Sequence, residues 1–290
     1  MADSYTLHHP ISSAAETPPR RKVLVTGAAG RIGSYFAQHS HNRYDLRLLV
    51  LDPHDEEVAA LKDYGEVIAG DVTDLESIRT ACQDVDTVLH LAGNPSPTAT
   101  WHSVRDVNIE GTYHTMVAAK AAGCRRVVFA SSIHAVAGYP PDRQVMTDDP
   151  VNPADLYGVS KCFGEAMGRY MAQQQDLSVI AVRICGFQPL DFARREDSAP
   201  MLDAFVSDRD LNQLLCRCVD DEKINFAIVH GLSDNQFKRL DLTRTRELLD
   251  YHPQDDLTKM NPRLKDLDLT PQDHNDQRKP GIREELDRLK

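Results

Sequence analysis

Residues 22–33 read KVLVTGAAGRIG, and this stretch decides the fold. A β-rich run of five residues leads into glycines at positions 27, 30 and 33. The first glycine permits a tight turn, the second lets the backbone approach a pyrophosphate, and the third allows the next helix to pack closely on the strand. Free N–H groups at the start of that helix attract phosphate. The stretch therefore predicts a dinucleotide-binding turn, with Gly27, Ala29, Gly30, Arg31, Ile32 and Gly33 as expected cofactor contacts.

Strand and helix patterns alternate beyond this turn. Short apolar runs predict strands over residues 22–26, 46–51, 66–69, 87–91, 126–130 and 178–183. Helices are predicted over 31–40, 104–122 and 157–174, and the sequence TDLE at 73–76 predicts a capping box that starts another helix. This alternation indicates a doubly wound parallel sheet, that is, a Rossmann fold of the α/β class.

The chain is expected to contain one large domain with appendages. The expected parts are a disordered tail over 1–21, the dinucleotide-binding domain over 22–183, a small substrate-binding segment over 184–262 and a charged tail over 263–290. Within the small segment, the pattern predicts helices over 210–219 and 243–249 and a strand over 225–230.

The composition limits the partners. A formal net charge of -11 argues against binding to nucleic acid or to anionic membranes, because both attract positive charge. No apolar run reaches the ~18 residues that would span a bilayer, and the first residues lack the apolar core of a signal peptide. The six cysteines are scattered, and no histidine or carboxylate cluster has the spacing of metal ligands. We therefore expect a soluble, cytoplasmic protein without a metal site.

Acidic residues follow the second and third predicted strands. Asp52 lies 19 residues after Gly33, where a carboxylate would hydrogen-bond the adenosine ribose and repel a 2′-phosphate. This favours NAD over NADP, with Arg31 as the feature that keeps NADP as an alternative. Asp71 and Val72 are expected to meet the adenine, although a simple turn at the strand end also explains Asp71.

A tyrosine and a lysine four residues apart form the candidate proton-transfer pair. Tyr157 and Lys161 would lie on one face of a helix. A free tyrosine has a pKa near ~10, and a nearby ammonium together with a positive nicotinamide would lower it. Ser132 follows the fifth strand, so its hydroxyl would emerge at the carboxyl edge of the sheet, where such sheets bind ligands. The alternative is a surface tyrosine and lysine on an amphipathic helix.

Five motifs occur in order: the glycine turn at 27–33, LAG at 91–93, Asn108 within VNIEG at 107–111, Ser132, and Tyr157 with Lys161. Together they resemble the extended short-chain dehydrogenases/reductases over about residues 22–260. The resemblance implies that Ser132 polarises the substrate oxygen and that Tyr157 exchanges its proton. It also implies that Lys161 holds the nicotinamide ribose and lowers the pKa of Tyr157. Asn108 would influence a water molecule of the proton relay, and a distortion of its helix would make this possible. Further cofactor contacts are expected at Leu91, Ala92 and Gly93.

A narrower similarity involves FASSIH at 129–134 and LYGVSKCFGE at 156–165. Both stretches are similar to those of the uronate dehydrogenases and their hexose-oxidising relatives. This similarity implies an enzyme that oxidises the anomeric carbon of a hexuronate, an aldose or a hexose phosphate to a lactone and passes the hydride to NAD. The expected substrate contacts are Ser132, Ile133, His134 and Gly186.

The chain departs from the uronate pattern where the carboxylate would bind. The pattern has asparagine at Ile133, serine at Gly186 and an arginine near Pro200. Loss of that arginine removes the natural bidentate partner of a carboxylate. Arg194 or Arg195 would have to substitute for it, so uronate is one candidate among several.

Two other functions remain open on the sequence alone. A nucleotide-sugar epimerase or dehydratase would use the same tyrosine and lysine with tightly bound NAD, but such enzymes generally have a larger C-terminal region than 184–262. A non-catalytic dinucleotide sensor or scaffold usually lacks the pair. In the resembling family, helices equivalent to 104–122 and 157–174 pair between subunits. The resemblance thus implies a homodimer or higher homo-oligomer, and residues 117–122 are expected to be exposed for it.

Overall fold

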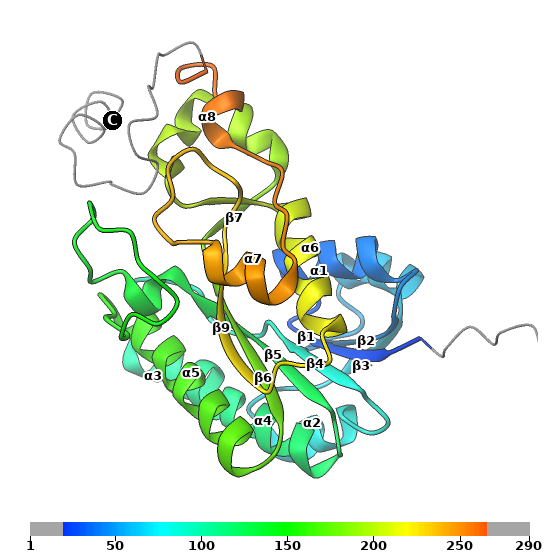
Figure 1. Cartoon of the computed structure of the whole chain (residues 1–290). Coiled ribbons are helices and arrows are strands. Elements are labelled where there is room, and N and C mark those ends of the chain that lie inside the picture. The colour runs from blue at the N-terminus through cyan, green and yellow to red at the C-terminus, as the bar shows by residue number, and fades with distance from the viewer. Residues whose placement is uncertain (1–19, 266–290) are drawn as a thin grey trace, which may run out of the picture.

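The computed structural model describes residues 20–265, and its centre is a seven-stranded parallel sheet (Figure 1). The strand order is β3-β2-β1-β4-β5-β6-β9. The strands are β1 (Lys22–Thr26), β2 (Asp45–Val50), β3 (Glu66–Ala69), β4 (Thr87–His90), β5 (Arg126–Ser132), β6 (Ser178–Ile184) and β9 (Phe226–Gly231). The order of succession reverses between β1 and β4, which creates a crevice outside the carboxyl ends of these strands. The predicted Rossmann fold is confirmed.

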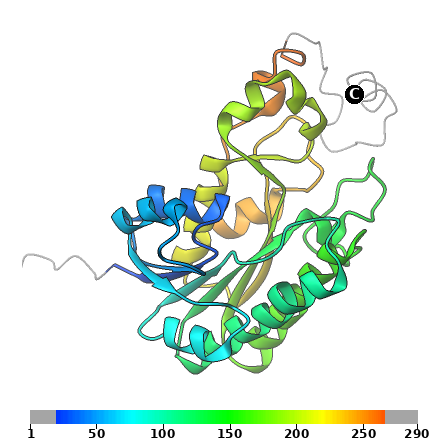
Figure 2. The ribbon, with the colours of Figure 1, turned by 180° about the vertical axis from the view of Figure 1, so that it is seen from behind.

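Helices cover both faces of the sheet (Figures 1 and 2). On one face lie α1 (Arg31–Ser40) and α6 (Asp208–Asp220), and on the other lie α2 (Leu75–Ala81), α4 (Gly111–Ala121) and α5 (Leu156–Gln174). Successive side chains of a strand point to opposite faces. In β6, Ile180 therefore packs with the α6 layer and Val179 with the α5 layer. None of the helices in residues 20–265 has both the length and the apolar character that a membrane span requires.

Two predicted helix starts differ in detail from the structure. The helix expected over 104–122 begins as α3 (Trp101–Val104), widens into a π-helix (Arg105–Glu110) and continues as α4. The helix start expected within 73–76 is present: α2 begins at Leu75, and its N-cap is Asp74 in place of Thr73, with the Asp74 carboxylate accepting the Glu76 N–H at 3.1 Å. A carboxylate is a strong cap at the positive end of a helix.

The expected exposure of residues 117–122 is also wrong in part. Ala118 and Ala119 are fully buried, because this side of α4 packs on the sheet and on α2. The large exposed apolar side chains on α4 and α5 include Tyr113, Val159 and Tyr170. A 3-10 helix over Glu56–Asp63, which was not predicted, follows β2.

The segment 184–262 is divided between the sheet and a small separate core. Its strand β9 pairs with β6 and so extends the main sheet, with α7 (Thr243–Leu249) beside it. The strands β7 (Gly186–Gln188) and β8 (Phe205–Ser207) form a second, two-stranded sheet. Two 3-10 helices, Leu190–Arg194 and Glu196–Met201, and α8 (Leu257–Met260) enclose a third apolar cluster with β8. The predicted C-terminal tail starts at residue 263, and the structure describes it up to residue 265. Leu264, in this part, is buried in the same apolar cluster.

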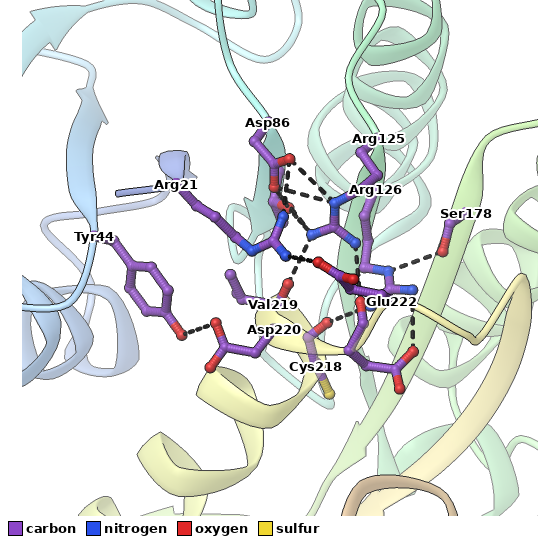
Figure 3. A network of polar contacts seen from close by, with 12 residues as sticks. Arg21, Tyr44, Asp86, Arg125, Arg126, Ser178, Cys218, Val219, Asp220 and Glu222 are labelled. Atoms are coloured by element: carbon purple, nitrogen blue, oxygen red, sulfur yellow. Dashed lines mark hydrogen bonds and ion pairs between the residues drawn. The ribbon is translucent and has the colours of Figure 1, made fainter. Parts of the chain in front are cut away.

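At the amino edge of the sheet, two arginines hold the end of α6 (Figure 3). Arg126 is 1% exposed, and it donates to the carbonyl oxygens of Cys218 at 2.9 Å and Ile224 at 2.7 Å. Arg125 donates to the carbonyl oxygen of Val219 at 2.7 Å. The last carbonyl groups of a helix have no partner within the helix. The arginines supply these partners and thereby tie α6 to the start of β5.

Candidate active site

The glycine turn joins β1 to α1 at the crevice. Gly27 has a φ of +68°, a conformation that glycine adopts without strain. A Cβ at Gly27 would lie 2.8 Å from the backbone nitrogen of Ala92, and one at Gly33 would collide with the Gly27 carbonyl oxygen. Gly30 is the N-cap of α1 and has no side chain to cap it. The bare helix end and the close backbone approach fit the pyrophosphate of a dinucleotide.

The residues expected on the adenosine side follow β2 and β3. Asp52 is exposed, and its carboxylate accepts the His54 N–H at 2.8 Å. Asp71 accepts the Thr73 N–H at 2.9 Å, while Val72 is buried. Both carboxylates hold local turns, and both lie at the edge of the sheet that carries the glycine turn, because β2 and β3 run parallel to β1.

Arg31 crosses the crevice. Its Nη2 donates to Oε1 of Gln188 at 2.7 Å and to the carbonyl oxygen of Phe187 at 3.2 Å. The guanidinium also lies 5.6 Å from the centre of the Phe187 ring. Arg31, the residue for which NADP was kept as an alternative cofactor, therefore hydrogen-bonds to β7.

A buried histidine supports the backbone that follows β4. His90 Nδ1 lies 2.8 Å from Oγ1 of Thr26, and its Nε2 lies 3.2 Å from Oγ1 of Thr112. Burial lowers the pKa of His90 to about 3, so the ring is neutral at pH 7. Thr26 Oγ1 also accepts the Ala92 N–H at 3.2 Å. These contacts hold residues 91–93 beside Gly27, and Leu91 and Gly93 line the cavity described below.

Ser132, Tyr157 and Lys161 meet at the carboxyl end of β5, and all three are buried. The Lys161 Nζ lies 5.5 Å from the centre of the Tyr157 ring. Burial raises the pKa of Tyr157, the hydrogen bond with Ser132 lowers it in part, and the Asp155 carboxylate raises it further. Burial lowers the pKa of Lys161 to about 8. In the chain without cofactor, loss of solvation is the largest influence on the Tyr157 pKa.

Asn108 lies in the π-helix, so the helix distortion expected at this residue is present. Its side chain is buried, and Oδ1 accepts the Asn94 N–H at 2.7 Å. Nδ2 donates to the Asn94 carbonyl oxygen and to Oγ of Ser160, each at 3.0 Å. Asn108 thereby links the loop after β4 to α5 next to Lys161.

The glycine turn, Ser132, Tyr157 and Lys161 line one cavity of about 380 Å³ that extends to β7, a volume typical of small-molecule sites. Its lining includes the expected substrate contacts Ser132, Ile133, His134 and Gly186. The side at Gly186 is apolar, because Met201 Cε occupies the place of a Cβ on this glycine. The cavity therefore brings together the predicted substrate residues and many of the predicted cofactor residues, whereas Ala29, Asp52, Asp71, Val72, Ala92 and Asn108 lie outside its lining.

The two arginines considered for a carboxylate lie elsewhere. Arg194 is exposed and paired with Asp191, and Arg195 is exposed and bonded to Asp197 at 2.5 Å. Both lie outside the set of residues that line the cavity. In this structure, neither replaces the arginine of the uronate pattern.

The family model described as "NAD dependent epimerase/dehydratase family" matches residues 23–188. The chain belongs to this family. The predicted resemblance to extended short-chain dehydrogenases/reductases is thus confirmed, and NAD is the cofactor.

Relatives of this family member cover most of its length. A protein of Haloferax volcanii named NAD-dependent glucose-6-phosphate dehydrogenase is 38% identical over 250 residues, which are 80% of this chain and 93% of the relative. A uronate dehydrogenase of Pseudomonas syringae pv. tomato is 30% identical, with 82% and 83% covered. The solved structure of a uronate dehydrogenase variant from Agrobacterium tumefaciens complexed with NAD has a TM-score of 0.74 at 29% identity, with 82% and 86% covered.

Some residues in or near the cavity of this epimerase/dehydratase family member were not predicted from the sequence. Phe187 lies in the three-residue strand β7 and Met201 ends a 3-10 helix of six residues, and elements this short show no periodic pattern. Asp155 caps α5 and contacts His134. Its position directly before the helix was a signal for an N-cap, but the sequence held no sign of the contact 21 residues back along the chain.

Proposed function

We propose that this NAD-dependent sugar dehydrogenase oxidises the anomeric carbon of a cyclic sugar to a lactone, with Tyr157 as the acid/base. The observation that supports this most is the meeting of Ser132, Tyr157 and Lys161 in a cavity that opens onto the glycine turn. Hydroxyl, phenol and ammonium groups that converge beside a dinucleotide site are suited to moving one proton while hydride leaves. The sugar dehydrogenases among the relatives support the substrate class.

The proton transfer follows from the contacts of Ser132. Its Oγ accepts the His134 N–H at 3.2 Å, so its own hydrogen is free to be donated to the phenol or to the reacting oxygen. The Tyr157 oxygen takes the proton of the anomeric hydroxyl as the C1–H bond breaks. The oxidised nicotinamide, when bound, supplies the hydride acceptor. Lys161, buried with its ammonium beside the ring, favours the phenolate over the neutral phenol once cofactor and substrate replace water.

A hexose 6-phosphate is the first substrate to test. The relative at 38% identity has this activity in its name, and the charged side chains that line the cavity, Arg31 and Lys161, are both cationic. An aldose comes second. A hexuronate comes third, because the wall at Gly186 is apolar and Arg194 and Arg195 lie outside the lining.

A substrate panel tests the proposal. The enzyme is incubated with NAD or NADP and with aldoses, hexuronates and hexose phosphates, and the absorbance of the reduced cofactor is followed at ~340 nm, the nicotinamide signal that reports hydride transfer. We expect reduction with at least one sugar and a preference for NAD. Absence of reduction across the panel would refute the proposal. Turnover of a UDP- or GDP-sugar without net NADH, by enzyme purified with NAD, would support an epimerase instead.

The Tyr157→Phe variant tests the proton-transfer role. Removal of the hydroxyl should lower kcat by about 10²-fold or more, the usual contribution of general acid–base catalysis. NAD affinity, measured by calorimetry, should change little because the ring remains. A variant with wild-type kcat would contradict the role given to Tyr157.

We also propose that the protein is a homodimer paired through α4 and α5. These helices contact each other and expose Tyr113, Val159 and Tyr170 by 43–49%. Apolar side chains gathered on neighbouring helices favour burial against a partner. The molar mass from light scattering tests this assembly.

A further inference from the structure

A histidine and a carboxylate form a pair at the rim of the cavity, where α5 begins. His134 Nδ1 lies 2.7 Å from Oδ2 of Asp155. The other carboxylate oxygen, Oδ1, accepts the Gly158 N–H at 2.7 Å. One carboxylate thus caps the helix that carries Tyr157 and also holds an imidazole that lines the cavity.

The imidazole is fixed from several sides. Its ring meets the Tyr157 ring edge-on, with centres 5.3 Å apart and an interplanar angle of 62°. The His134 backbone N–H donates to Ser132 Oγ at 3.2 Å. A Cβ at Gly158 would collide with the His134 carbonyl oxygen, so this glycine allows the close approach. His134 is therefore held against both groups that face the reacting oxygen.

The carboxylate determines which ring nitrogen carries the proton. An ionised carboxylate only accepts hydrogen bonds, so the neutral imidazole must bear its hydrogen on Nδ1. The Nε2 atom then has a free lone pair and can accept a hydrogen bond. Beside a sugar whose anomeric oxygen meets Ser132 and Tyr157, the nearest further donor is the hydroxyl on the neighbouring carbon.

We propose that Asp155 is a positioning residue of the sugar site, which fixes His134 with Nε2 as the acceptor for the hydroxyl next to the reacting carbon. This inference rests on the proposed function, because it assumes a sugar with its anomeric carbon at Tyr157. It narrows the substrate class to sugars with a free hydroxyl at that carbon. Sugars with a 2-deoxy or 2-acetamido group would lack the donor or fill its place.

The charge of Asp155 also acts on the proton transfer. The titratable groups around the Tyr157 phenol are Lys161 on the same helix, Asp155 at its start, His134 in the preceding turn and Cys185 across the cavity. The Asp155 carboxylate contributes to the raised pKa of Tyr157. Removal of that charge lowers this pKa. Oxidation requires the phenolate, so the rise of kcat/KM with pH should move to lower pH in a variant without the charge.

Two variants separate positioning from helix capping. Asp155→Asn keeps an oxygen for the Gly158 N–H, but its amide N–H₂ would face Nδ1 and turn Nε2 into a donor. Asp155→Ser keeps a good N-cap and leaves the imidazole without its partner. The probes are glucose 6-phosphate and its 2-deoxy analogue, each followed by NADH formation.

Wild type should prefer glucose 6-phosphate over the 2-deoxy sugar by about tenfold or more in kcat/KM, the worth of one good hydrogen bond. Both variants should lose most of this preference and show the pH limb at lower values. In a His134→Ala background, Asp155→Asn should reduce the preference no further. An Asp155→Ser enzyme with wild-type preference and pH profile would reduce Asp155 to a helix cap and overturn the inference.

The tautomer gives a readout that does not depend on turnover. Nitrogen-15 NMR of histidine-labelled enzyme with NAD should show His134 protonated on Nδ1 in wild type and on Nε2 in Asp155→Asn, with His134→Ala to assign the signal. A wild-type ring protonated on Nε2 overturns the inference whatever the substrate. A silent sugar panel overturns the proposed function instead, so the two failures are distinguishable.

Discussion

Two glycines have left-handed backbones but differ in their surroundings. Alanine substitutions at these positions can therefore distinguish the free-energy cost of a left-handed backbone from the cost of a steric clash. Gly27 and Gly123 have φ values of +68° and +76°. A Cβ at Gly27 would press on the backbone of Ala92, whereas a Cβ at Gly123, just after α4, would meet nothing within 4 Å. The same substitution at the two positions therefore differs only in its surroundings.

We expect Gly123→Ala to lower the free energy of unfolding by about 1–2 kcal/mol, the price of a left-handed alanine, and to leave the KM for NAD unchanged. Gly27→Ala should cost more, because residues 91–93 must shift, and should raise the KM for NAD by about tenfold or more. Urea unfolding and initial rates measure both effects. Equal KM values for the two variants would remove Gly27 from the cofactor site.

At the scale of the element, the end of α6 depends on the arginines at the start of β5 (Figure 3). Arg126→Met keeps much of the apolar stem but removes the donor to the buried carbonyl group of Cys218 and one of the two donors to the carbonyl group of Ile224, which keeps Ser178 Oγ. We expect a loss of about 3 kcal/mol or more in the free energy of unfolding. Arg244→Met, at an exposed pair with Glu247, should change stability by less than about 1 kcal/mol. Urea denaturation distinguishes them, and similar midpoints would show that Arg126 is not needed.

Some of the secondary-structure elements could be predicted from the sequence and others could not. The glycine turn and the strands of the main sheet follow local patterns of apolar residues, and the structure has them within one or two residues of the predicted bounds. The π-helix at Asn108 has no local pattern that separates it from the α-helix around it. The pairing of β7 with β8 joins three-residue strands that start 19 residues apart, Gly186 with Phe205, so no short window contains it.

The same limit applies within the site. Ser132, Tyr157 and Lys161 stood out because family motifs mark them. The tie from Arg31 to Gln188 and the contact of His134 with Asp155 depend on the completed fold. Contacts of this kind depend on how elements far apart in the sequence pack together, so no characteristic residue spacing in the sequence predicts them.

At the scale of the whole molecule, the proposed dimer can be disrupted by one charge. Val159→Glu places a carboxylate in the apolar face of α5, where burial without a partner is costly. We expect the molar mass from light scattering to fall to that of one chain. Leu51→Glu, at a residue 77% exposed after β2, should keep the wild-type mass. A wild-type protein that is already monomeric would exclude this assembly.

The Arg31 bridge has a consequence for how the two ligands influence each other. Arg31 belongs to the start of α1, where we propose that the dinucleotide binds, and its guanidinium contacts Phe187 and Gln188 of β7, next to the proposed sugar contact Gly186. If both ligands bind as proposed, a ligand that orders one of these two elements reduces the ordering that the other ligand requires, and we expect the two to bind cooperatively. Thermodynamic reciprocity then requires that NAD strengthen sugar binding by the same factor by which the sugar strengthens NAD binding.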